Sequence, residues 1–156
     1  MPSRYTKKST LIVAAALMVA PLGALFAEGS DIYKVRHDGY HDLGDAFKTL
    51  RDEVRESSPN AAKIKTATAV VADVAIKQYD WFPAGSGPKP GVKTRAKAEI
   101  WSKPSEFAAA QKLFADAAAK LNKAAAAGDI AAVKAQFGDV GKTCKNCHDN
   151  FRTPED

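Results

Sequence analysis

Two cysteines and a histidine stand close together near the C-terminus, in the run Cys144-Lys145-Asn146-Cys147-His148. These two cysteines are the only ones in the chain. Two thiols at this spacing can form thioethers with the two vinyl groups of one porphyrin, and the adjacent histidine can then bind its iron. The C-x-x-C-H pattern therefore predicts one covalently attached haem c, with Cys144 and Cys147 as attachment points and His148 as the iron ligand.

Three other kinds of site also use paired cysteines. A disulfide between Cys144 and Cys147 would close a very short loop and add little stability. A thioredoxin-like redox pair needs a βαβ context, and the sequence has no strand pattern of any length. A zinc site needs four ligands, whereas this motif supplies three, two of them adjacent in the chain. The pattern therefore favours haem over all three.

The N-terminus has the layout of a secretory signal peptide. Arg4, Lys7 and Lys8 precede an apolar run over residues 11–20, and an alanine, Ala27, offers a small residue at which to cut. The apolar run is shorter than the ~20 residues that a membrane-spanning helix needs. We therefore expect residues 1–27 to be removed as a signal peptide. Haem c is attached outside the bacterial inner membrane, so the motif and the signal both predict a periplasmic protein.

Removal of the signal peptide changes the composition of the chain. Subtracting the three basic residues from the formal net charge of +5 leaves +2, which is weak support for a nucleic-acid partner. Residues 28–156 have a length that suits one domain, and we expect them to contain no stable membrane span. The only methionines, Met1 and Met18, leave with the signal, so the mature chain has no methionine to bind iron.

Four stretches of the mature chain have apolar residues at three- and four-residue steps, which is typical of amphipathic helices. They cover residues 31–56, 58–79, 102–127 and 129–151. Ser58, Ser102 and Asp129 are the expected N-caps, and Gly128 is expected to end the third helix. Residues 80–101, rich in Pro and Gly, form a long crossover. We predict an all-α, antiparallel four-helix bundle with the haem near its C-terminal helix.

With these motifs placed, the sequence resembles the class II c-type cytochromes, the cytochrome c-prime family, over about residues 31–152. A haem motif on the last helix is the specific part of the resemblance. The other matching residues are Phe137-Gly138-Asp139-Val140-Gly141 before the motif, Phe151-Arg152 after it, Glu99-Ile100-Trp101-Ser102, Ala127-Gly128-Asp129, and Val35-Arg36 followed by Leu43 and Phe47.

The resemblance implies a periplasmic four-helix bundle, often a homodimer, that holds haem between its helices. In that family the distal position lies four residues after an arginine of the first helix, here Arg36, which places Tyr40 at the distal side. Family members carry either Met there, with six-coordinate iron, or an apolar residue, with five-coordinate iron. Tyr40 departs from both patterns.

Tyr40 has three possible roles. It can block the distal face as a bulky aromatic, donate a hydrogen bond to a bound diatomic molecule or water, or bind iron as tyrosinate. We rank the first two above ligation, because a phenol has an ordinary pKa of ~10. His37 and His41 are further candidates on the same helix, and we expect them to lie on the surface. His41 is ~100° around the helix from Tyr40.

Two arginines are candidates for binding the haem propionates. Arg36 lies one helical turn before Tyr40, and the resemblance implies that it is near the haem. Arg152 lies one turn after His148, where it either approaches the haem or complements the helix dipole.

Taken together, these residues predict a periplasmic electron carrier that serves redox partner proteins. Its iron would be high-spin or weakly ligated at Tyr40. The alternative is a protein that captures or senses a diatomic gas, NO or CO, at an open distal side. A peroxidase-like enzyme ranks lowest, because the distal side offers no acid–base pair beyond His37 and Arg36. We therefore expect a protein without enzymatic activity.

Overall fold

The computed structural model describes residues 23–154. Its elements in chain order are α1 (Gly23–Glu53), α2 (Ala61–Lys77), the 3-10 helix η1 (Gln78–Asp80), α3 (Glu99–Ser102), α4 (Pro104–Ala127) and α5 (Ile130–Phe151). The basic residues and apolar run of the predicted signal peptide lie outside the described residues. The predicted cut after Ala27 falls in the first turns of α1 and stays a prediction.

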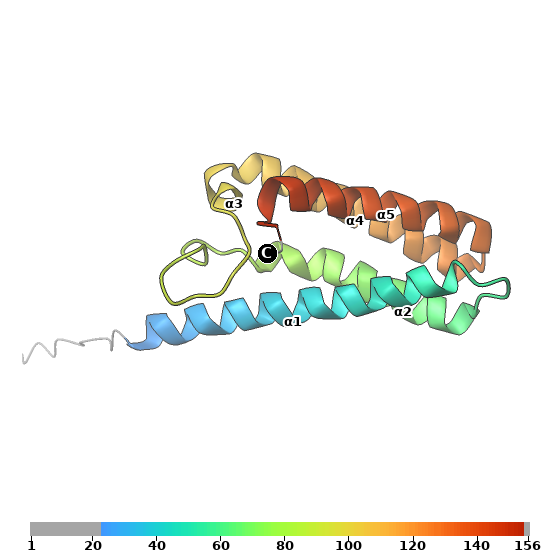
Figure 1. The fold of residues 1–156 in the computed structure, drawn as a ribbon, viewed down its shortest axis with the longest axis horizontal. Helices are drawn as coiled ribbons and strands as arrows, with labels where there is room; N and C mark the ends of the chain where they lie inside the picture. The colour runs from blue at the N-terminus through green and yellow to red at the C-terminus, as the bar shows by residue number, and fades with distance from the viewer. Residues whose placement is uncertain (1–22, 155–156) are drawn as a thin grey trace, which may run out of the picture.

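The four long helices form an antiparallel bundle, as predicted (Figure 1). Packing follows the chain: α1 lies against α2, α2 against α4, and α4 against α5. Over residues 23–154 the only β-type pairing is one isolated bridge between Ala96 and Arg152. No helix in this part of the chain is long and apolar enough to cross a membrane.

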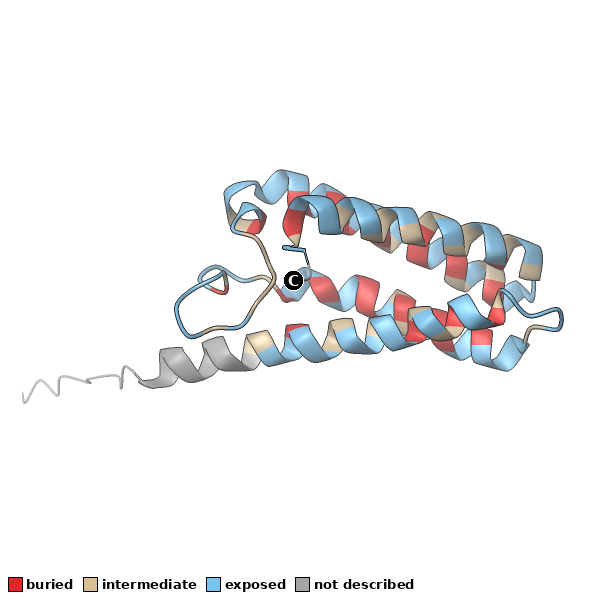
Figure 2. Ribbon diagram, viewed as in Figure 1, coloured by how far each residue is buried: buried red, intermediate tan, exposed pale blue. Residues whose placement is uncertain are grey.

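The apolar stripes of the helices meet in one core (Figure 2). The stripes predicted for α2 and α4 are buried along their whole length, and removing such side chains from water is the main favourable contribution to folding. The largest side chains with almost no exposed surface are Leu50, Ile64, Thr68, Val71, Leu121, Val133 and Val140. A smaller cluster of Ile100, Phe107, Ala110 and Phe151 lies at the end of the bundle near the crossover.

Three helix starts differ from the sequence prediction. Helix α1 begins at Gly23 and not at the predicted residue 31. The N-cap of α2 is Asn60, whose side chain accepts a hydrogen bond from Lys63 N at 3.1 Å, so the predicted cap Ser58 is wrong. Helix α4 begins at Pro104 with Lys103 as its N-cap, and the predicted cap Ser102 instead ends the short helix α3. Proline disfavours helical backbone in the residue before it, which explains the break at Lys103.

The other predicted helix boundaries fare better. The side chain of Asp129 accepts from Ala132 N at 2.9 Å and caps α5. Gly128 ends α4 in the left-handed region with φ 73°, which glycine adopts without a Cβ penalty. Both are confirmed. The first helix ends at Glu53, three residues earlier than the predicted residue 56.

The crossover between α2 and α4 is ordered by hydrogen bonds to the bundle. The indole of Trp101 donates to Pro83 O at 3.0 Å, and Tyr33 of α1 donates its hydroxyl to Gly87 O at 2.6 Å. Farther along, Lys97 N donates to Phe151 O at 3.0 Å and Thr153 N donates to Arg95 O at 2.8 Å. The crossover is therefore hydrogen-bonded to α1 through Tyr33 and to the end of α5 through Phe151 and Thr153.

Candidate haem site

A cavity of about 900 Å³ lies at the crossover end of the bundle. Helices α1 and α5 supply opposite walls, α4 and the end of α2 supply the floor, and crossover residues 93–96 form part of the rim. Ligand cavities in proteins are usually between about 300 and 1,000 Å³. This one is therefore large enough for a bulky planar group.

The predicted haem motif lies on the α5 wall. Cys144, Cys147 and His148 all line the cavity; the two cysteines are half-buried free thiols, and His148 is exposed. Burial raises the pKa of Cys147 to about 11 and also raises that of Cys144. Lys145 and Asn146 point outward as exposed spacers. One turn of α5 therefore presents both attachment points and the iron ligand to a single space.

The walls also leave room for the group that the motif requires. Gly44 of α1 and Gly141 of α5 both line the cavity. A Cβ at Gly44 would meet nothing within 4 Å, and one at Gly141 would meet only the ring of Phe47 at 3.8 Å. Open space beside glycines on facing helices, together with two thiols and an imidazole, fits haem c.

Tyr40 lies on the α1 wall of the cavity, which the sequence predicts to be the distal side. Its hydroxyl donates to Gln78 Oε1 at 3.2 Å, and its ring packs edge-on against Trp81 with centroids 5.0 Å apart. Burial raises the pKa of the Tyr40 phenol well above its usual range. The phenol is therefore protonated at neutral pH and acts as a hydrogen-bond donor.

Comparison with known proteins now fixes the family. The family model described as Cytochrome C' matches residues 31–152, most of the chain. The chain belongs to the cytochrome c′ family. Its cofactor is accordingly haem c, attached covalently and containing iron.

Individual cytochromes c′ match over almost their whole length. The protein from Alcaligenes xylosoxydans xylosoxydans is 35% identical over 128 residues, which is 81% of this chain and 97% of that protein. A cytochrome c′ described as having an unusual ligand-controlled dimer dissociation superimposes with a TM-score of 0.75 and 30% identity, covering 81% and 97% of the two chains. A nitric oxide complex of a mutant cytochrome c′ from Alcaligenes xylosoxidans gives 0.73 and 32%, with the same coverage.

In this cytochrome c′, the two histidines of α1 lie at the rim of the cavity. The side chains of His37 and His41 are 75% and 69% exposed, as expected from the sequence. His37 lies beside Asp38 at 3.2 Å and His41 beside Asp45 at 3.6 Å. Each of these histidines therefore has an acidic neighbour on its own helix.

Arg36 lines the cavity, but its guanidinium is engaged with the crossover. Its Nε and Nη2 donate to Trp81 O at 3.0 and 2.7 Å, and Nη2 also donates to Ser86 Oγ at 2.7 Å. Two further bonds of 3.2 Å reach Ser86 O, and the charge lies 4.2 Å from the centre of the Phe82 ring. Burial lowers the pKa of this guanidinium. The propionate role stays a prediction, and the structure adds that Arg36 anchors the crossover.

Arg152 follows α5 in extended backbone and lines the cavity. It pairs with Ala96 through the isolated bridge, which brings Arg95 and Lys93 of the crossover to the same rim. The cavity mouth therefore gathers several basic side chains, to which the acidic propionates of a haem are suited. Lys93 and Arg95 were not predicted, because nothing in the sequence connects the crossover to the end of α5.

Two further residues of the site escaped the sequence prediction, Gln78 and Gln111. Both line the cavity and both are buried. A signal was present: Gln111 continues the inner stripe of α4 between Phe107 and Phe114, and Gln78 lies one turn beyond Val74 on the inner face of α2. A polar side chain within an apolar stripe indicates a buried polar contact.

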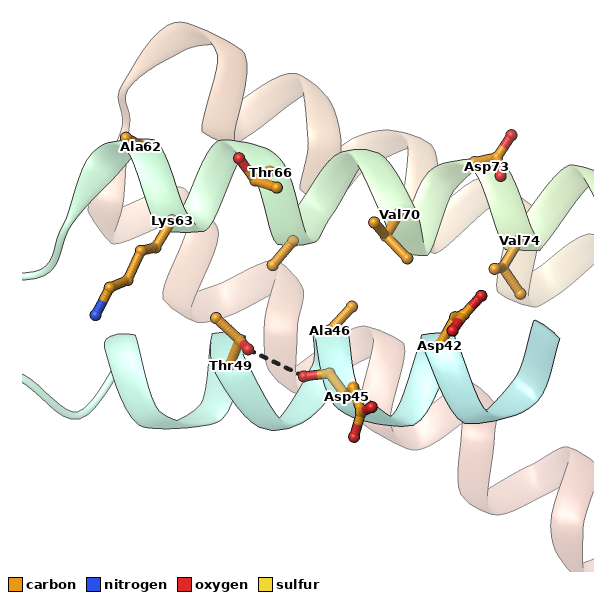
Figure 3. A pocket seen from close by; sticks show the side chains of 11 residues that line it. Asp42, Asp45, Ala46, Thr49, Ala62, Lys63, Thr66, Val70, Asp73 and Val74 are labelled. Atoms are coloured by element: carbon orange, nitrogen blue, oxygen red, sulfur yellow. Dashed lines mark hydrogen bonds between the residues drawn. The ribbon is translucent and has the colours of Figure 1, made fainter. Parts of the chain in front are cut away.

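A second, shallower hollow of about 660 Å³ lies between α1 and α2 (Figure 3). Ala46, Val70 and Val74 form its floor, and charged side chains including Asp42, Asp45, Asp73 and Lys63 line its edges. No cysteine or histidine lines it. This groove is therefore distinct from the haem site and is a surface feature of the α1–α2 face.

Proposed function

We propose that this chain is a periplasmic haem c protein that binds a diatomic gas, NO or CO, on the distal side of its cavity behind Tyr40. The observation that carries the proposal is the makeup of the α1 wall. Among the described residues lining that wall, Tyr40 is a protonated phenol bonded to Gln78, and His37 and His41 each lie beside a carboxylate of the same helix. A strong protein ligand for a sixth iron position is therefore not in place there.

The residues of the α1 wall and of the α5 wall have different roles. When bound, haem c supplies the iron at which a gas or an electron is exchanged. Cys144 and Cys147 hold the group, and His148 provides the proximal imidazole. Tyr40, with Trp81 and Phe82 packed against it, excludes water and larger molecules from the distal side. A diatomic ligand is small enough to enter with a limited movement of the phenol.

The relatives support a gas ligand. Nitric oxide is bound in the structure of the mutant cytochrome c′ from Alcaligenes xylosoxidans, which shares 32% of its residues with this chain. By extension, we propose that this chain binds ligand rather than catalysing a reaction, because its distal wall offers no acid–base pair beyond His37 and Arg36, and the Arg36 guanidinium is engaged with Trp81 and Ser86.

Optical spectra of the holoprotein test this proposal. The chain is produced in a strain competent for cytochrome c maturation, and ferric and ferrous spectra are recorded with and without CO. We expect high-spin ferrous bands that shift on adding CO, and no band from iron-bound tyrosinate in the ferric form at neutral pH. Sharp low-spin ferrous bands that ignore CO would refute the proposal.

Electron transfer is the second candidate, and one observation favours it. The motif residues Lys145, Asn146 and His148 are exposed, so the edge of the haem would lie close to the surface, where a redox partner can approach. Basic residues at the mouth, Lys93 and Arg95 among them, would attract an acidic partner protein. Electron exchange with a small anionic reagent that slows in Lys93→Glu, with an unchanged CO spectrum, would support this role.

We also propose export and a homodimer. The N-terminal pattern of basic and apolar residues supports removal of residues 1–27, which intact-mass measurement of periplasmic protein tests directly. The related cytochrome c′ described by its dimer dissociation supports a homodimer, and we place the second copy on the α1–α2 groove because its floor is apolar. Val70→Glu should then yield monomers by light scattering, whereas Leu113→Glu, at a 54% exposed position of α4, should leave the dimer intact.

A further inference from the structure

Gln78 and Gln111 form a reciprocal pair of buried amides beneath the distal wall. Gln111 Nε2 donates to Gln78 O at 3.1 Å, and Gln78 Nε2 donates to Gln111 O at 3.5 Å and to Ala75 O at 3.3 Å. The two side chains are only 3% and 6% exposed. Because the amide nitrogen of Gln78 is held by two carbonyl oxygens, its Oε1 is turned toward the cavity.

Tyr40 is the donor that Gln78 Oε1 meets there, at 3.2 Å. The phenol stays protonated, since burial raises its pKa, so the bond has a donor at any physiological pH. Swinging the ring away would leave a buried carbonyl oxygen without its donor. Leaving such a group unsatisfied costs more than the bond itself contributes.

The buried amide is not explained by packing alone. Gln78 continues the inner stripe of α2, where Val71 and Val74 are buried apolar side chains. A leucine would fill a similar volume without any need to satisfy an amide. The polar group therefore occupies a position where an apolar one would suit the core, and its oxygen accepts the hydrogen bond of Tyr40.

We propose that Gln78, oriented by Gln111, is a positioning residue that holds Tyr40 across the distal side and thereby sets the rate at which a diatomic ligand enters. This rests on the proposed function, because it presumes that a ligand enters past Tyr40. Entry requires the phenol to move, and movement breaks its bond to Gln78. A hydrogen bond of ordinary net strength changes a rate by about fivefold.

The test measures CO association with the ferrous holoprotein by stopped flow. Gln78→Leu is expected to bind CO about fivefold faster than the unaltered protein, and Tyr40→Phe, which also lacks the bond, at least as much faster. The double variant Gln78→Leu/Tyr40→Phe should bind no faster than Tyr40→Phe alone. A rate that rises equally on adding Gln78→Leu to either background would overturn the proposal, because the effect would then not pass through Tyr40.

Thr68→Val is the matched control for the loss of a buried hydrogen bond. Thr68 has no exposed surface and donates to Asn122 Oδ1 at 3.1 Å, and it does not line the haem cavity. We expect this variant to lose stability and keep its CO rate. A comparable acceleration in Thr68→Val would mean that general loosening of the bundle, and not Gln78, governs entry.

A second measurement separates this proposal from the proposed function. If neither the unaltered protein nor Tyr40→Phe binds CO, the gas-binding function is refuted. Ultraviolet resonance Raman spectra then test the hydrogen bond between Tyr40 and Gln78 by itself. The Tyr40 signal is obtained as the difference between the spectra of the unaltered protein and Tyr40→Phe. Loss of the hydrogen-bonded phenol signature in Gln78→Leu supports the positioning role, and an unchanged signature overturns it.

Discussion

Replacing Arg36 with leucine should destabilise the protein mainly by releasing the crossover from α1. The substitution keeps an aliphatic side chain against Phe82 and removes every N–H donor. Two main-chain carbonyls, those of Trp81 and Ser86, then lose a charged donor. Arg36 is 6% exposed and Ser86 3%, so water does not replace those bonds without local opening.

The magnitude follows from these contacts. A hydrogen bond to a charged group contributes about 1.5–3 kcal/mol to stability, and contact of the guanidinium with an aromatic ring contributes about 0.5–2 kcal/mol. The bonds share one guanidinium and are not additive, and part of the loss is recovered as the crossover opens to water. We expect a loss of about 3 kcal/mol, which for a domain of this size lowers Tm by roughly 10 °C.

Denaturant unfolding of the ferric holoprotein measures the loss, and limited trypsin digestion locates it. The crossover carries Lys93, which is exposed and precedes Thr94, so cleavage after Lys93 should accelerate in Arg36→Leu. Arg51→Leu is the matched control: Arg51 lies on the same helix, is 46% exposed and pairs only across the surface with Asp52 at 3.3 Å, so it should change stability by less than about 0.5 kcal/mol. An Arg36→Leu protein as stable as the control variant, with an unchanged tryptic pattern, would refute the anchoring role.

Three other outcomes follow from the packing. Gly39→Ala should destabilise by about 1–3 kcal/mol, because its Cβ would meet the Trp81 ring at 2.1 Å, whereas Gly138→Ala, with nothing within 4 Å, should stabilise by up to about 1 kcal/mol; equal shifts in Tm would contradict this. Leu121→Ala, at a position with 0% exposure, should cost about 2–5 kcal/mol in chemical denaturation. The pKa of Glu53 lies below its ordinary 4.5, first because its carboxylate accepts from Asn60 N–H and second because it pairs with Lys63. The ionised Glu53 therefore stabilises the folded protein above pH 4.5, and this contribution is lost as the pH falls through the lowered pKa. Glu53→Gln should therefore be less stable than the unaltered protein at pH 7 and equally stable in strong acid, and a constant difference across pH would show that the charge is irrelevant.

The sequence carried the features that depend on residue type and spacing. The C-x-x-C-H motif, the four apolar stripes and the caps at Gly128 and Asp129 are local signals, and the structure has all of them. The errors at Ser58 and Ser102 arose where two candidates compete within a few residues. Asn60 and not Ser58 is the N-cap because the Asn60 N–H also donates to Glu53 Oε2 at 2.8 Å. This bond connects the end of α1 to the start of α2 and holds Asn60 in the capping position.

The contacts of Arg36 were beyond sequence reasoning for a different reason. Its acceptors are main-chain carbonyls 45 and 50 residues away, and because every residue has a carbonyl, no side-chain type marks the partner. The same holds for the bridge between Ala96 and Arg152. Sequence can place an arginine on an inner face, but only the folded crossover decides what the arginine binds.

The position of Tyr40 in this cytochrome c′ depends on one short segment that follows α2. Within about one turn of α1, Arg36 binds Trp81 O, Gly39 lies against the Trp81 ring, and Tyr40 donates to Gln78. Each residue meets a different group of the same segment, so the segment cannot shift without moving all three contacts. Changes at Gln78 or Trp81 should therefore alter the position of Tyr40 as effectively as changes on α1 itself. In this fold Tyr40 belongs to α1, while its placement depends on the connection that follows α2.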